Sequence, residues 1–158
     1  MSWERGRGTI ERLLDGGELE RVAPSDEVAA RLMADAEAHI RLASKGVGDD
    51  PGGALQLSYD AARKASAALL AIQGLRATTR GGHIAAIDAV RAQFNERGGT
   101  DVFGRLSRLR RRRNATEYPN PDSPTVTTEE AERALETARE TLDAAKRLIK
   151  SSRVDPFE

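Results

Sequence analysis

The sequence predicts an all-α protein: an up-and-down helical bundle of about five helices with a short N-terminal helix in front. Apolar residues recur three and four positions apart over long segments, which is the spacing of one face of a helix. Long runs of Val, Ile, Thr and aromatic residues, which are typical of strands, are absent. Aromatic residues make up only 4% of the 158 residues, so a core of Ala-rich helices is favoured over a bulky sheet core. This length is that of one domain, and we expect a single domain over residues 1–158.

The chain opens with a segment that we expect to form a short helix over about residues 2–14, ended by Asp15-Gly16-Gly17. Trp3 would pack this helix onto the bundle or, if exposed, mark an interface. We interpret residues 1–24 as an N-terminal extension of the main bundle.

The next two predicted helices form the first long pair of the bundle. One covers about residues 25–46, and Ser25 can cap its first turn because a Ser hydroxyl accepts hydrogen bonds from backbone N–H groups there. The other covers about residues 54–75 and presents a face of mostly small residues, which lets a neighbouring helix approach closely. The apolar stripe of the first helix consists of Val28, Leu32, Ala36, Ile40 and Ala43, and the face of the second consists of Leu55, Ser58, Ala62, Ala65, Leu69 and Ile72.

Three further helices complete the expected bundle. The fourth covers about residues 83–95. The fifth covers about residues 101–117 and ends there because Pro119 disfavours helical geometry at the residue before it. The last begins at Thr127, which fits a capping box with the Glu three positions later. Its apolar residues form a coiled-coil-like seam that would close the bundle core or join two copies. We expect residues 151–158 to be frayed.

Composition excludes several classes of chemistry. The chain has no Cys, which removes disulfides, thiolate metal sites and Cys nucleophiles and fits a reducing compartment. No two His residues stand at the spacing of a metal-binding pair, and the glycines at 46–53 lack the following Lys-Ser or Lys-Thr of a P-loop. We therefore expect neither a metal nor a cofactor. No apolar run follows the start, and none approaches the roughly 20 residues of a membrane span, so we expect a cytoplasmic protein without a membrane partner.

The charge of the chain is balanced overall, with 25 basic and 25 acidic residues, but one basic cluster stands out. Six of the nine residues 105–113 are Arg. On a helical wheel the apolar stripe of this helix continues into Arg113, and a half-buried Arg needs a partner because an unpaired buried charge is costly. Glu117 stands one turn further on. We expect one polar cluster at this helix end, made of Arg110, Arg113, Asn114, Glu117 and Tyr118, and we expect the other arginines, Arg105, Arg108, Arg111 and Arg112, to be solvated.

Spacing alone leaves two interpretations of this cluster open. An Arg–Glu pair that closes a helix is common and purely structural. Clustered guanidinium groups also bind phosphate oxygens bidentately and attract nucleic acid. The two histidines leave a similar choice. We interpret His39 as a packing or surface residue, and His83 either as a residue that caps a helix start or as a group that reaches Arg113 across a cleft.

The segment Arg113-Asn114-Ala115-Thr116-Glu117-Tyr118 resembles the motif of the HEPN domain superfamily, in which an Arg, often followed by Asn, precedes a His near the end of a late helix. In this chain Tyr118 stands at the His position. Residues 59–65, Tyr-Asp-Ala-Ala-Arg-Lys-Ala, resemble the third-helix segment of such proteins, and Gly82-His83 resembles the start of their next helix. The resemblance spans about residues 28–149.

The resemblance implies a helical bundle directed at RNA, since many HEPN proteins are metal-independent ribonucleases, toxins or abortive-infection factors. The implied site residues are Arg113 for the phosphate, Asn114 for orientation, Glu117 and Tyr118 for proton transfer or hydrogen bonding, and Arg110 and His83 for binding. Because a Tyr side chain is a poor base at pH 7, the resemblance implies an altered active site rather than the usual one.

The resemblance also implies partners. These are RNA, a second copy of the chain in a homodimer, and a cognate antitoxin protein if the chain serves in toxin–antitoxin or phage-defence systems. The alternative function is a non-catalytic HEPN bundle that binds a protein or a nucleotide, and a plain helical scaffold is a third possibility.

Overall fold

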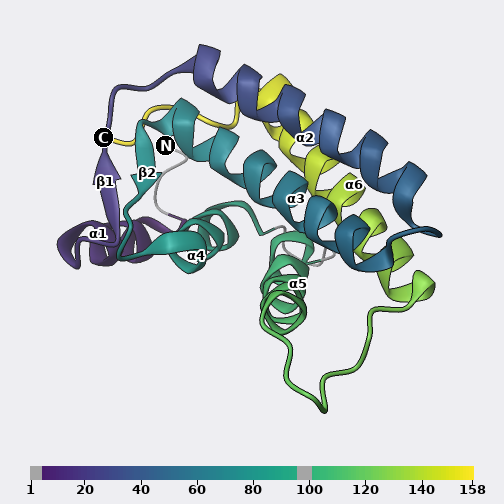
Figure 1. Cartoon of the computed structure of the whole chain (residues 1–158). Helices are drawn as coiled ribbons and strands as arrows, with labels where there is room; N and C mark the ends of the chain where they lie inside the picture. The colour runs from purple at the N-terminus through teal and green to yellow at the C-terminus, as the bar shows by residue number, and fades with distance from the viewer. Residues whose placement is uncertain (1–4, 96–100) are drawn as a thin grey trace.

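The computed structural model of the chain describes residues 5–95 and 101–158. Over these two ranges the chain forms six helices and one pair of short strands, which confirms the all-α prediction (Figure 1). The helices are α1 (Arg7–Asp15), α2 (Asp26–Gly46), α3 (Pro51–Gln73), α4 (Gly82–Phe94), α5 (Val102–Glu117) and α6 (Thr128–Lys150). Among the residues described, no helix is both long and apolar enough to cross a membrane.

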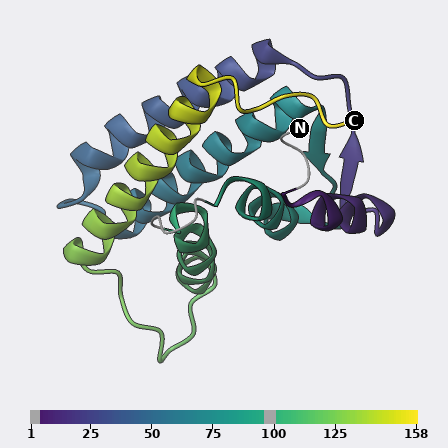
Figure 2. The ribbon, with the colours of Figure 1, turned by 180° about the vertical axis from the view of Figure 1, so that it is seen from behind.

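Helix α3 lies at the centre of the bundle, with the long helices α2 and α6 running beside it (Figures 1 and 2). Thirteen of its 23 residues are buried, and eight of these are Ala or Ser. The predicted small-residue face is therefore confirmed, because it allows two helices to approach α3 closely. The shorter helices α4 and α5 contact α3 as well, but they run across the long helices rather than along them.

Two helix starts were predicted from capping residues and are confirmed. The Ser25 hydroxyl accepts a hydrogen bond from the N–H of Val28 at 3.1 Å. Thr127 and Glu130 form the predicted capping box. Helix α3 begins earlier than predicted, because Asp50 caps it by accepting from the N–H of Gly53 at 2.9 Å and Pro51 fits its first turn.

The strands β1 (Leu19–Arg21) and β2 (Leu75–Ala77) were not predicted. They pair antiparallel, with Leu19 opposite Ala77 and Arg21 opposite Leu75. Three residues are too few to show the alternation of a strand in the sequence. The pair joins the segment after α1 to the segment after α3. The apolar residues of α1, Ile10 and Leu13, are buried in the same core as the bundle. Helix α1 begins at Arg7, and Trp3 lies outside the described residues.

The C-terminal segment is ordered against the bundle, so the prediction of a frayed end at 151–158 is wrong. Val154 and Phe157 are buried, and the N–H of Phe157 donates to the carbonyl of Gln73 at 2.9 Å. The guanidinium carbons of Arg7 and Arg21 each lie 5.1 Å from the centroid of the Phe157 ring. Two isolated apolar residues give no periodic pattern, so the sequence did not reveal this docking.

Candidate phosphate-binding site

Helices α3, α4 and α5 meet at the side chain of Tyr59, which is 1% exposed. Its hydroxyl lies 2.8 Å from Nδ1 of His83, the second residue of α4. The guanidinium carbon of Arg113, on α5, lies 5.7 Å from the centroid of the Tyr59 ring. Tyr59 thus brings His83 and Arg113 together from two different helices. We call the residues around it, Tyr59, Asp60, Arg63, His83, Arg110, Arg113 and Glu117, the Tyr59 cluster.

Arg113 is held on two further sides, and its side chain is 26% exposed. One of its terminal nitrogens lies 2.5 Å from a carboxylate oxygen of Glu117, and the same nitrogen donates to Oδ1 of Asn114 at 3.3 Å. The ion pair one turn apart is the one that the wheel predicts. Arg113 is therefore positioned by an aromatic ring, a carboxylate and an amide, and it stays partly open to solvent.

A second guanidinium comes from α3 itself. Arg63 binds Asp60 through Nη2 at 2.5 Å and through Nε at 3.0 Å. Burial alone would raise the pKa of Asp60, but the hydrogen bonds and charges of Arg63 and Lys64 outweigh it and lower that pKa. Asp60 is thus a fixed anion that orients Arg63. His39 lies 3.3 Å from the other oxygen of Asp60 and 2.7 Å from Lys64, in a network that packs α2 against α3.

Burial raises the pKa of Tyr59 to about 12, although the positive charges of Arg63, Arg110 and Arg113 act against it. The phenol therefore keeps its proton at neutral pH. Burial, followed by the charges of Arg63 and Arg113, lowers the pKa of His83, so this partly exposed ring is neutral at pH 7. A neutral ring can accept from the phenol at Nδ1 and carry its proton on Nε2. It can also donate from Nδ1 and leave Nε2 open as an acceptor.

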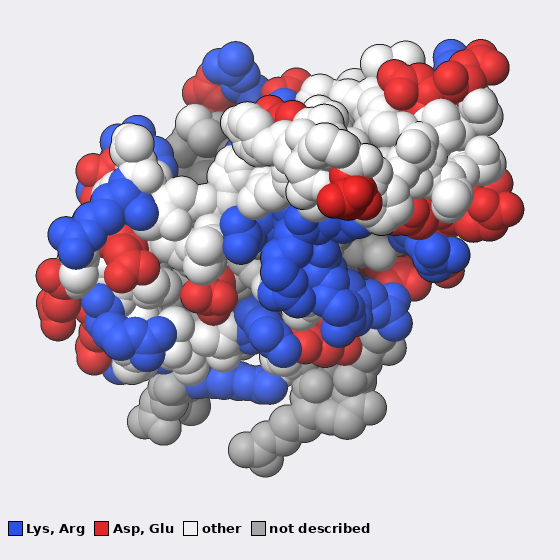
Figure 3. All heavy atoms as spheres, turned by 60° about the horizontal axis from the view of Figure 1, so that its bottom comes forward, with Lys and Arg blue, Asp and Glu red and all other residues white. Residues whose placement is uncertain are grey.

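The charges of the Tyr59 cluster favour an anion. Arg63, Arg110 and Arg113 outnumber the carboxylates of Asp60 and Glu117 by one. Within the described part of the chain, Arg110 forms no ion pair or side-chain hydrogen bond. Around α5, basic side chains gather in one dense patch on the face of the molecule shown in Figure 3. A phosphate group fits this arrangement, because guanidinium groups bind its oxygens in a fixed geometry.

The structure brings some of the predicted site residues together and leaves one apart. Arg113, Glu117, Asn114 and His83 all lie in or beside the Tyr59 cluster. Tyr118 caps the end of α5 with its N–H bonded to the carbonyl of Asn114, and its side chain is 76% exposed. Tyr118, which the resemblance aligns with the motif His, therefore points to solvent, whereas His83 of the preceding helix α4 lies in the cluster.

Two arginines predicted to be solvated are in fact paired. Arg105 forms an ion pair with Glu140. Arg112 binds Glu130 at 2.6 Å and donates to the carbonyl of Pro124 at 3.2 Å. Both acids belong to α6, and a helical wheel of α5 alone cannot show them. Arg108 and Arg111 are exposed, as predicted.

Sequence reasoning did not single out Tyr59, Asp60 or Arg63, although the segment that contains them stood out as a whole. The sequence did contain a feature that could have indicated them, since these three polar or aromatic residues stand close together in an Ala-rich helix. Such residues on one turn of a central helix are candidates for a site. Among the residues that the structure describes, no group of three or more His, Asp or Glu side chains could hold a metal ion.

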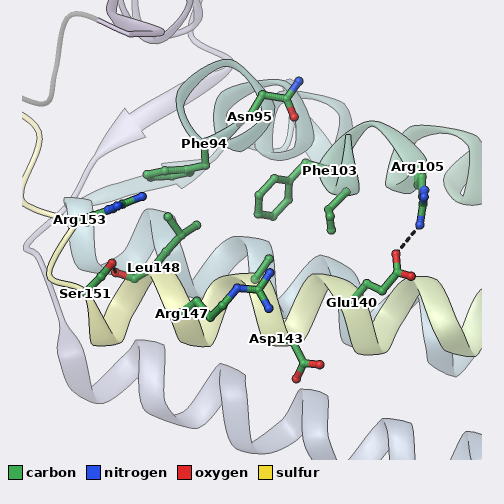
Figure 4. A pocket seen from close by; sticks show the side chains of 12 residues that line it. Phe94, Asn95, Phe103, Arg105, Glu140, Asp143, Arg147, Leu148, Ser151 and Arg153 are labelled. Carbon is green, nitrogen blue, oxygen red and sulfur yellow. Dashed lines mark hydrogen bonds and ion pairs between the residues drawn. The ribbon is translucent and has the colours of Figure 1, made fainter. Parts of the chain in front are cut away.

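A separate hollow of about 490 Å³ lies between α4, α5 and the end of α6. The rings of Phe94 and Phe103 face it, and the Arg105–Glu140 pair closes one end (Figure 4). Arg153 lies at the opposite end, and Arg147 lies between the two ends. None of the residues of the Tyr59 cluster lines this hollow, so it is not part of the site described above.

Fold and site together define an all-helical bundle with an arginine-rich site where a late helix ends. The family model of the HEPN domain matches residues 29–148, and the chain therefore belongs to the HEPN domain family. Comparisons with curated proteins and with solved structures found no match.

Proposed function

We propose that this HEPN protein binds RNA at the Tyr59 cluster and cleaves it without a metal ion. The observation that carries the proposal is that His83 and Arg113 both contact Tyr59. A phosphate-binding cation and a neutral imidazole are thereby held at one place. Attack of a ribose 2′-hydroxyl on the adjacent 3′-phosphate requires these two groups, a cation for the phosphate and a base for the hydroxyl proton.

In the proposed reaction Arg113 and Arg110 bind the oxygens of the scissile phosphate. Glu117, Asn114 and the Tyr59 ring position Arg113. His83 accepts the proton of the 2′-hydroxyl at Nε2 while the 2′-oxygen bonds to phosphorus. The bond from phosphorus to the 5′-oxygen breaks, that oxygen takes a proton from water, and the hydroxide formed takes the proton that His83 holds. The products are a 2′,3′-cyclic phosphate and a 5′-hydroxyl, so atoms and charge balance.

The test is incubation of the purified full chain with mixed RNA and tRNA in EDTA. We expect cleavage that Arg113→Ala and His83→Gln abolish. Arg110→Gln should weaken RNA binding, whereas Arg111→Gln removes the same charge one position away from an exposed arginine and should have a much smaller effect. Equal effects of Arg110→Gln and Arg111→Gln would show that only the overall charge of α5 matters. Absence of both cleavage and RNA binding in the unaltered chain refutes the proposal.

The biological setting that we propose is a toxin or defence factor that acts as a homodimer and is held in check by an antitoxin protein. Expression of the chain should then slow bacterial growth, and expression of Arg113→Ala should not. Light scattering of the purified protein gives its oligomeric state directly. A monomer at micromolar concentration would contradict the proposed homodimer.

The second candidate function is a non-catalytic module that binds a protein or a nucleotide. The contacts of Arg113 with Glu117 and the Tyr59 ring favour it, because they already satisfy much of the guanidinium. Under this alternative Arg113→Ala lowers the melting temperature and removes no activity. The unaltered protein would also leave RNA intact while binding a nucleoside phosphate in calorimetry.

A further inference from the structure

A groove of about 710 Å³ runs along the surface where α2, α3 and β2 meet the start of α4. Its lining is mainly aliphatic, and it includes Leu32, Ala67, Leu70 and Ala86. Val28, at its rim, is 47% exposed, although the helical pattern of α2 places it on the apolar stripe. A volume of this size and a mostly apolar lining are typical of sites for small molecules or for parts of larger ligands.

The groove is continuous with the Tyr59 cluster. Arg63 and His83 line the groove, and the same two side chains lie within electrostatic range of the buried Tyr59 hydroxyl. If a phosphate of an RNA strand binds Arg110 and Arg113, the base next to that phosphate must lie within one nucleotide's length of the Tyr59 cluster. Arg63 and His83 line this groove, whereas no residue of the Tyr59 cluster lines the hollow of about 490 Å³ beside α6.

We infer that the groove holds one unstacked nucleobase of the RNA strand whose phosphate lies at the Tyr59 cluster. The inference rests on the proposed function and adds to it a site for the base. Single-stranded RNA is commonly recognised by bases that leave the stack and bury their faces against protein side chains. The positive charge at the cluster end of the groove is complementary to the phosphate that joins this base to the rest of the strand.

The polar groups of the groove predict weak discrimination between bases. The Ser25 hydroxyl is used to cap α2, and the Thr78 hydroxyl donates to the carbonyl of Gly17 at 2.6 Å. Few groups are therefore left to read the edge of a base. The groove should require that a base is present and should depend only weakly on which base it is.

The experiment compares two substitutions on α2 that make the same chemical change. Val28→Glu places a carboxylate at the rim of the groove. Leu42→Glu removes another exposed apolar residue, 58% exposed, and adds the same charge outside the groove. The probes are a fluorescent single-stranded RNA of twelve nucleotides, a strand of the same length that is abasic throughout, and inorganic polyphosphate, which carries no bases.

We expect Val28→Glu to weaken RNA binding about tenfold relative to Leu42→Glu, since the loss of one base contact has an effect of this size. Polyphosphate should bind both variants equally. Ala67→Leu, which fills the groove without adding charge, should act like Val28→Glu. The fully abasic RNA should reproduce the loss with the unaltered chain, and the substitutions should then have no further effect.

Equal RNA binding by Val28→Glu and Leu42→Glu overturns the inference, and the proposed function survives if Arg110→Gln still weakens that binding. A second copy of the chain is the main alternative occupant of the groove, and light scattering tests for it. If Val28→Glu and Ala67→Leu dissociate a dimer and RNA binding is unchanged, the groove is an interface between two copies and holds no base. Failure of the unaltered chain to bind RNA refutes the proposed function itself.

Discussion

The hydroxyl of Tyr59 lies 2.8 Å from Nδ1 of His83, and the two residues are 24 positions apart in the chain. This hydrogen bond fixes the orientation of the imidazole relative to Arg113. Tyr59→Phe removes the hydroxyl and keeps the ring beneath the guanidinium. We expect it to lower the free energy of unfolding by only about 1 kcal/mol and to lower cleavage at least tenfold, while RNA binding is retained. Loss of RNA binding together with cleavage would show that the hydroxyl supports the whole cluster instead.

A pH dependence of stability follows from the lowered pKa of His83. The unfolded chain takes up a proton at this His as the pH falls through about 6.5, whereas the folded chain resists protonation until the pH is lower. The free energy of unfolding should therefore decrease as the pH falls below about 6.5 and change no further once the folded ring is also protonated.

The measurement for this prediction is the melting temperature of the unaltered chain and of His83→Gln between pH 7.5 and 5. His83→Gln should show a smaller decrease over that interval. His39→Gln is the comparison variant, since His39 contacts Asp60 and Lys64 rather than the Tyr59 hydroxyl. Parallel curves for the unaltered chain and His83→Gln would contradict the prediction.

The proton acceptor in the proposed reaction can be separated from the motif position. Tyr118→Phe changes an exposed side chain outside the Tyr59 cluster, so cleavage should fall less than threefold. His83→Gln should abolish it. The measurement is the rate of RNA cleavage in EDTA for the two variants. A larger loss of cleavage rate in Tyr118→Phe than in His83→Gln would show that Tyr118, and not His83, takes part in proton transfer.

The end of α3 is joined to α4 by a buried pair of amides. Gln73 and Gln93 exchange side-chain hydrogen bonds at 2.7 and 3.1 Å. Gln73→Leu leaves the buried Oε1 of Gln93 without its donor, while Nε2 still donates to the carbonyl of Ala89, and should lower the free energy of unfolding by about 1–3 kcal/mol. Replacing both residues by Leu should recover part of this loss in chemical denaturation. If the double variant loses more free energy of unfolding than the two single variants lose together, the two amides do not stabilise each other in this way.

The docking of the C-terminal segment should contribute measurably to stability. Phe157→Ala removes a buried ring that contacts two guanidinium groups and should lower the free energy of unfolding by about 3 kcal/mol. Asp155→Ala, an exposed neighbour, is the control and should change it by less than about 0.5 kcal/mol. Similar denaturation midpoints for both variants would show that the segment only rests on the surface.

Features that depend on residues close in sequence could be predicted, and features that depend on distant residues could not. The capping box of Thr127 and Glu130 and the Arg113–Glu117 pair follow from spacings of three and four residues. The Arg112–Glu130 pair and the contact of Tyr59 with His83 join residues 18 and 24 positions apart. The direction in which α4 and α5 cross α3 decides such contacts, and helical periodicity does not encode it.

The two halves of α5 are held in different ways. Its buried residues, Phe103, Gly104, Leu106 and Leu109, all precede the arginines at 110–113. The second half is held by charged and polar contacts, which dissolved salt screens. That half can open locally while the first half stays anchored in the core. Rising ionic strength should therefore speed amide hydrogen exchange in residues 110–117 before it affects α3, and a bound polyanion should slow that exchange again.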